Sequence, residues 1–62
     1  MNLQNLRSRL SKALELSGES QYGFAEKHGI SYSYLNKFLK GWMTNPRLST
    51  LNDFERVIGK YL

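Results

Sequence analysis

The sequence predicts an all-α fold, a compact four-helix bundle that contains a helix-turn-helix. Apolar residues recur at helical spacing in four segments, and glycine, serine and proline separate these segments. No segment shows the alternation of apolar and polar residues that marks a half-buried strand. The chain has 62 residues and no cysteine, which favours one domain with a small core and no disulfide. We therefore expect a single domain over residues 1–62.

The first helix is expected in the N-terminal segment MNLQNLRSRLSKALELSG. Asn2 can cap its start, and Gly18 offers a left-handed stop at its end. The basic residues Arg7, Arg9 and Lys12 fall outside the apolar face. That face consists of Leu3, Leu6, Leu10, Ala13 and Leu14.

A second, shorter helix is expected to follow the capping residue Ser20 and to run to Lys27 or His28. Gly23 weakens it, since glycine inside a helix costs about 1 kcal/mol against alanine. Gly29 ends it, because the chain must turn there with a positive φ. The core residues of this helix are Phe24 and Ala25.

Ser31 is expected to cap a third helix, which Gly41 closes. Ile30 precedes it as an apolar plug. Its buried face consists of Leu35, Phe38 and Leu39. Its polar face carries Ser33, Asn36, Lys37 and Lys40, with Tyr32 and Tyr34 on the flanks.

The segment WMTNPR is expected to be a loop, since Asn45-Pro46 favours a turn. We expect Trp42 and Met43 to form a partly buried lid over the third and fourth helices, with a ligand patch as the alternative. The fourth helix is expected to begin at Ser49 or Thr50. Its buried stripe consists of Leu48, Leu51, Phe54, Val57, Ile58, Tyr61 and Leu62.

The charge balance is basic, with nine Lys and Arg residues, five Asp and Glu residues and a net charge of +4. A basic excess favours a polyanionic partner through counterion release, although many small domains carry such a charge for solubility alone. No apolar run approaches the roughly 20 residues that span a bilayer. We therefore expect no membrane partner and a cytoplasmic location.

The sequence offers little for metal or catalytic chemistry. His28 is the one histidine and cysteine is absent, so we expect no metal site and read His28 as a helix C-terminal residue. Asp53 and Glu55 lie two apart on a helix and point in different directions, so they cannot flank one substrate. We expect no catalytic residues, no cofactor and no enzymatic activity.

Residues 20–41 contain two short helices joined by a glycine turn, which is the helix-turn-helix pattern. The spacing of these residues resembles the lambda-repressor-like, or Xre, family. The resemblance rests on Ser20-Gln21, Phe24-Ala25, Gly29-Ile30-Ser31, Leu35 and Gly41, and continues into Asn45-Pro46 and Ser49-Thr50-Leu51. It covers residues 3 to 60 and implies double-stranded DNA as the partner. Gly23 departs from the family, which usually has a better helix former there.

The third helix carries the candidate base contacts. The resemblance implies that the positions of Tyr32 and Ser33 reach base edges, and serine and tyrosine can meet several bases or a thymine methyl. Asn36 can bond bidentately to adenine, and Lys37 can bond to guanine or a phosphate. The alternative for each is a solvated polar residue or, for Tyr32, a flank residue half-packed on the bundle.

The candidate backbone contacts surround this helix. The resemblance implies that Gln21 approaches a phosphate and braces the first residue of the recognition helix, although it could also be a solvated polar residue. Lys40, Asn45 and Arg47 follow the third helix and could clamp the sugar-phosphate backbone. Arg7 could do the same from the first helix.

We expect a sequence-specific DNA-binding domain, a small transcriptional repressor or regulator of phage, plasmid or bacterial type. Many relatives carry a fifth helix used for dimerisation, whereas only four are expected here. We therefore expect a monomer or weak dimer that dimerises on an inverted repeat, with Ile58, Tyr61 and Leu62 left uncovered. The alternative is a protein-interaction module, such as an antitoxin or adaptor. It is disfavoured because Tyr32 to Gly41 contains no acidic residue.

Overall fold

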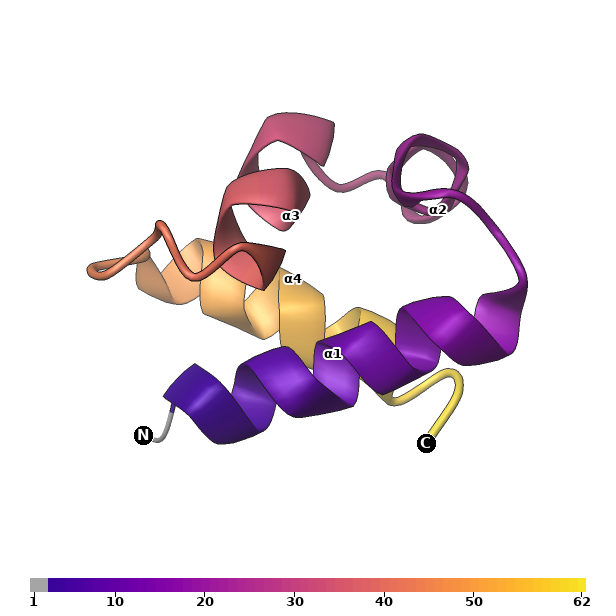
Figure 1. The fold of residues 1–62 in the computed structure, drawn as a ribbon, viewed down its shortest axis with the longest axis horizontal. Helices are drawn as coiled ribbons and strands as arrows, with labels where there is room; N and C mark the ends of the chain where they lie inside the picture. The colour runs from indigo at the N-terminus through magenta and orange to yellow at the C-terminus, as the bar shows by residue number, and fades with distance from the viewer. Residues whose placement is uncertain (1–2) are drawn as a thin grey trace.

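A computed structural model describes residues 3–62 of the protein. The described residues form four helices in two layers, with α1 and α4 side by side and α2 and α3 on top of them (Figure 1). The bounds are α1 Leu3–Ser17, α2 Gln21–His28, α3 Tyr32–Leu39 and α4 Leu48–Ile58. No strand is present among these residues, so the expected all-α bundle is confirmed.

The boundaries of the short helices follow from local hydrogen bonding. The Ser20 hydroxyl accepts from the Gly23 amide at 3.1 Å, and the Ser31 hydroxyl accepts from the Tyr34 amide at 3.2 Å. Both expected caps are therefore confirmed. Gly29 has a φ of 66° and its amide donates back into the end of α2, which confirms the left-handed turn. The expected Asn2 cap lies outside the described residues.

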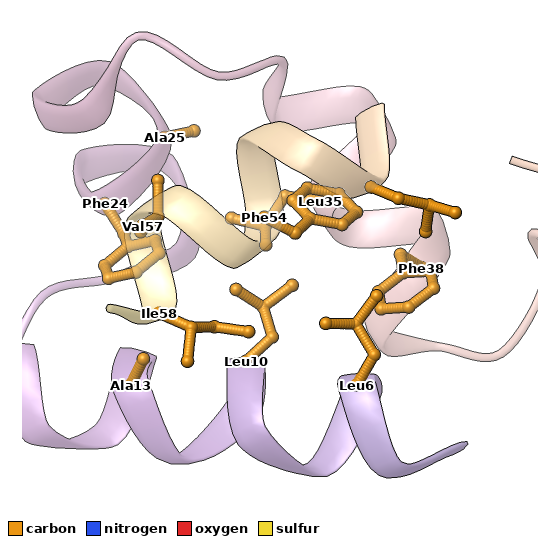
Figure 2. Packing of buried hydrophobic residues seen from close by; sticks show 11 residues of the cluster. Leu6, Leu10, Ala13, Phe24, Ala25, Leu35, Phe38, Phe54, Val57 and Ile58 are labelled. Atoms are coloured by element: carbon orange, nitrogen blue, oxygen red, sulfur yellow. The ribbon is translucent and has the colours of Figure 1, made fainter. Parts of the chain in front are cut away.

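The core lies between the two pairs of helices and draws on all four (Figure 2). Leu6 and Leu10 project from α1 toward Phe54 of α4, while Phe24 and Phe38 close the two ends. The Phe38 and Phe54 rings lie 5.0 Å apart between centroids. The eleven core residues are Leu6, Leu10, Ala13, Phe24, Ala25, Leu35, Phe38, Leu51, Phe54, Val57 and Ile58. Such a core holds α3 from behind and leaves its outer face free.

Two polar contacts tie distant segments together. The Arg7 guanidinium on α1 donates from Nε to the Phe38 carbonyl at 2.8 Å and lies 5.3 Å from the Phe38 ring centroid. At the other end, His28 Nε2 and the Tyr61 hydroxyl are 2.7 Å apart. The first contact fixes the C-terminal end of α3 on the scaffold, and the second fixes the chain end against α2.

The structure corrects several expectations about the fourth helix and the loop. Helix α4 begins at Leu48, not at Ser49 or Thr50, with Arg47 as its N-cap. Leu48 is 68% exposed because it lies in the first turn, ahead of the packed stripe. Leu62 lies beyond the helix and is exposed, whereas Ile58 is buried in the core instead of being uncovered.

Trp42 is not the expected lid. Its side chain is 68% exposed, whereas Met43, the other expected member of the lid, is partly buried against the core. Gly41, with a φ of 79°, turns the chain immediately before it, so the indole is directed away from the helices. Instead the Lys40 ammonium lies over its ring at 4.7 Å from the centroid.

Candidate nucleic-acid interface

Helix α3 is short and amphipathic, with one buried face and one outer face. Leu35 and Phe38 of α3 are fully buried, which directs the opposite side of this helix outward. Tyr32, Ser33 and Lys37 are exposed. These three candidate base contacts are therefore accessible on α3, with Tyr32 and Ser33 in its first turn and Lys37 in its last turn.

Asn36 is placed differently from its neighbours. Its side chain is half-buried, and its Nδ2 donates to Gln21 Oε1 of α2 at 2.8 Å. Gln21 therefore braces Asn36 in the second turn of α3, not the first residue of that helix, which the resemblance implied. The Asn36 amide oxygen has no partner among the described residues, and it remains an acceptor for a ligand.

Tyr22 belongs to the same surface and was missed by sequence reasoning. It lies in the first turn of α2 and is 60% exposed. Its ring meets the Tyr32 ring edge to face, with centroids 5.6 Å apart and an interplanar angle of 74°. Its position in the sequence could have indicated this. Tyr22 follows Gln21 at the start of α2, and the short turn between the helices brings this part of α2 close to the start of α3.

The candidate backbone contacts lie where α3 passes into α4. Lys40 is the C-cap residue of α3, and Arg47 is the N-cap residue of α4. No side chain caps α4, and its first turn contains no acidic residue, so its N-terminal amides retain the positive end of the helix dipole. A cavity of about 180 Å³ opens at this place. Its lining comprises Tyr34, Met43, Asn45, Pro46, Arg47 and Thr50.

The contacts of Arg7 are with the scaffold. Its Nε is committed to the Phe38 carbonyl and its guanidinium to the Phe38 ring. The side chain is half-buried and passes close to Gly41, where a Cβ would lie 3.8 Å from the Arg7 Cζ. Contact between its remaining N–H groups and a phosphate stays a prediction.

The ion pairs of the described residues all lie on α1 and α4. Arg9 and Glu55 bridge these two helices through two hydrogen bonds of 2.7 and 3.1 Å. Their hydrogen bonding raises the pKa of Arg9 and lowers the pKa of Glu55. The other two pairs, Lys12–Glu15 and Asp53–Arg56, lie within one helix each.

The surface of α3 and the following loop contrasts with that arrangement. No acidic residue occurs between Glu26 and Asp53. Lys37, Lys40 and Arg47 form no ion pair with any described residue. Unneutralised cations around a polar helix face produce a positive potential suited to an anionic ligand.

Residues 3–62 contain neither a metal-ligand cluster nor a membrane-spanning helix. No cluster of three or more His, Cys, Asp or Glu side chains is placed to hold a metal ion. His28 instead contacts Phe24 and Tyr61, and burial followed by the nearby Lys60, Lys27 and Arg56 lowers its pKa. None of the described helices has the length and apolar character needed to cross a bilayer.

Two capped helices around a left-handed glycine turn, with the second held outward by a core, define a helix-turn-helix protein. The family model described as helix-turn-helix matches residues 10–62. The chain therefore belongs to the Xre or lambda-repressor-like helix-turn-helix family, a family of DNA-binding domains. No curated protein and no solved structure matches the chain.

Proposed function

We propose that this protein is a sequence-specific binder of double-stranded DNA that inserts α3 into the major groove and acts as a small transcriptional repressor. The observation that carries the proposal is the charge asymmetry. The cations beside α3 are unpaired, whereas Arg9, Lys12 and Arg56 on α1 and α4 are neutralised by carboxylates. In a helix-turn-helix the N-terminal residues of the second helix meet the base edges. In this chain those residues are Tyr32 and Ser33.

The junction of α3 and α4 supports the same proposal. The uncapped N-terminus of α4 offers amide donors and a partial positive charge, which together suit a phosphate oxygen. Arg47 adds a full charge at this helix end, and Asn45 lines the adjoining cavity. Lys40 lies at the other side of the loop. These groups would fix the register of α3 on the duplex without reading sequence.

Repression would follow from occupancy of an operator that overlaps a promoter. Two copies on an inverted repeat would place their α3 helices one helical turn apart, about 34 Å. The exposed Leu62 and Leu48 leave apolar surface for a weak contact between copies. Such a protein acts where the DNA is, in the cytoplasm of a bacterial cell.

The decisive experiment is selection of binding sites from random duplex DNA, followed by fluorescence anisotropy over a salt series. We expect an enriched inverted repeat. If about four to six phosphates are neutralised, the slope of log affinity against log salt should be near −4 to −5. A slope near zero, or no binding at low salt, would contradict the proposal and favour a protein-interaction module.

A matched pair of variants separates local contacts from bulk charge. The double variant Lys40→Ala/Arg47→Ala should lower the magnitude of the salt slope by about two, and should weaken preferred and random DNA alike. The control Lys12→Ala/Arg56→Ala removes the same charge from α1 and α4, where both cations are exposed and paired. It should change the slope far less. Equal effects would mean that net charge alone drives binding.

A further inference from the structure

We propose that Tyr22 is a positioning residue for base recognition: it holds the Tyr32 ring so that the ring contacts the 5-methyl group of a thymine. This inference rests on the proposed function and adds a specificity to it. It begins with the edge-to-face contact of two exposed tyrosines, one from each helix of the helix-turn-helix.

The contact restricts a side chain that would otherwise be mobile. Tyr32 is the first residue of α3 and is 44% exposed, so little of the core holds its ring. Tyr22 comes from α2 and meets it at 5.6 Å between centroids and 74° between planes, a favourable geometry for two aromatic rings. A tyrosine has only two rotatable side-chain angles, so one such contact orders most of the side chain before DNA arrives.

The apolar rings of Tyr22 and Tyr32 favour contact with an apolar group of the DNA. The major groove of a T·A pair displays one apolar group, the thymine methyl, beside polar edges. An aromatic ring at the start of α3 is the apolar surface that such a methyl would meet. The same two helices also contribute the polar Gln21–Asn36 pair, so the tyrosine pair supplies the apolar part of this surface.

The test uses the selected duplex with each thymine replaced in turn by uracil, which removes the methyl and nothing else. For the wild-type protein we expect affinity to fall about fourfold at one thymine per half-site, since burying one methyl-sized group changes an equilibrium constant by about that factor. Tyr22→Ala should bring this thymine-to-uracil ratio close to one. Tyr22→Phe should restore it, because the ring edge remains.

Tyr34→Ala is the matched control, because Tyr34 has the same 44% exposure as Tyr32 and makes no ring contact with Tyr22. It should preserve the thymine-to-uracil ratio, and circular dichroism should show every variant folded. The proposal is overturned if Tyr22→Ala preserves the ratio. It is equally overturned if Tyr22→Phe behaves like Tyr22→Ala, which would indicate a hydroxyl contact, or if no thymine shows sensitivity.

The proposed function fails separately. Salt-dependent binding to a selected site without thymine sensitivity would remove the role of Tyr22 and leave the DNA-binding function intact. Absence of binding to any duplex would overturn both.

Discussion

Arg9 on α1 and Lys37 on α3 are both cations on the surface of the same small domain, yet their surroundings differ. Arg9 reaches across to α4 and meets both oxygens of Glu55. Lys37 meets no carboxylate among the described residues, and neither do Lys40 and Arg47. The charges of α1 and α4 are paired within the scaffold, whereas the cations of α3 and its loop have no carboxylate partner among the described residues.

The same division holds for the polar side chains. Arg7 donates a hydrogen bond from its Nε to the Phe38 carbonyl, and so helps to hold α3 in place. Ser33 on the outer face of α3 makes no side-chain hydrogen bond with any described residue. A stable scaffold satisfies its polar groups internally, while a recognition surface leaves donors and acceptors to be satisfied by its partner.

The largest effect on DNA binding should come from substitution of Asn36, which lies between the scaffold and the exposed surface of α3. Asn36→Ala should cost about 1–3 kcal/mol on the preferred site and little on random DNA, because it would remove the base contact predicted for this side chain. Anisotropy titrations on both duplexes measure the ratio. An unchanged specificity ratio would show that Asn36 belongs to the scaffold and only ties α3 to Gln21.

Gln21→Ala is the control for that experiment, since it removes the partner of the 2.8 Å bond and leaves Asn36 in place. We expect it to weaken binding to both duplexes through the lost phosphate contact and to reduce specificity less than Asn36→Ala does. A larger specificity loss for Gln21→Ala would mean that orientation of Asn36 matters more than its own contact.

The next largest effect concerns the joint between α2 and α3. Gly29→Val should lower the free energy of unfolding by about 2 kcal/mol, because an L side chain at positive φ is strained and a β-branched one more so. No neighbouring atom lies within 4 Å of a Cβ built at Gly29, so the loss comes from the backbone alone. Thermal or denaturant unfolding measures it.

Gly18→Val offers a matched comparison, since Gly18 has a φ of 72° and equally empty surroundings but joins α1 to α2. The stability losses should be similar. DNA affinity, measured where both variants are folded, should fall further for Gly29→Val, because only that turn sets the angle of α3. Equal affinities would show that the turn does not orient the recognition helix.

Much of the scaffold could be predicted from the sequence because its signals are local. The Ser20 and Ser31 hydroxyls accept from amides three residues on, and the Gly29 amide donates to carbonyls three and four residues back. The spacing of Leu6, Leu10 and Ala13 indicates one helix face. Trp42 could not be placed in this way. Its exposure depends on the direction in which the chain leaves Gly41, which periodicity does not encode.

The candidate interface was only partly predictable for the same reason. That Ser33, Lys37 and Tyr32 are exposed follows from helix periodicity. The Gln21–Asn36 and Tyr22–Tyr32 contacts each join α2 to α3, so they depend on the packing angle between two helices. Helix periodicity predicts Asn36 on the outer face, because it contains no information on the Gln21 contact from α2.

The smallest predicted effect concerns the scaffold alone, whose stability should depend on pH at two places. The pKa of His28 is lowered below its ordinary value of 6.5, first by burial and then by Lys60, Lys27 and Arg56, against a weaker opposing effect of Glu19. The unfolded chain therefore binds the proton more readily than the folded one. The stability associated with neutral His28 is complete above about pH 6.5 and is lost as the pH falls through the lowered folded value.

Glu55 behaves in the same direction in a more acidic window. Its bond to Arg9 lowers its pKa from 4.5, so the stability it contributes is present above that value and is lost only below it. Melting temperatures of the wild type should thus fall in two stages, the first as the pH drops below about 6.5 and the second below about pH 4.5. The exposure of the Arg9–Glu55 pair keeps the second stage small.

Two substitutions assign each stage of the pH-dependent melting to its titrating residue. His28→Gln should abolish the first stage and retain the second, because glutamine keeps a polar group near the Tyr61 hydroxyl but does not titrate. Glu55→Gln should do the reverse, since it leaves the contacts of His28 with Phe24 and Tyr61 in place. A first stage that persists in His28→Gln would place the titrating group elsewhere. The aromatic cluster would then hold the C-terminal end to α2 without making that contact sensitive to pH.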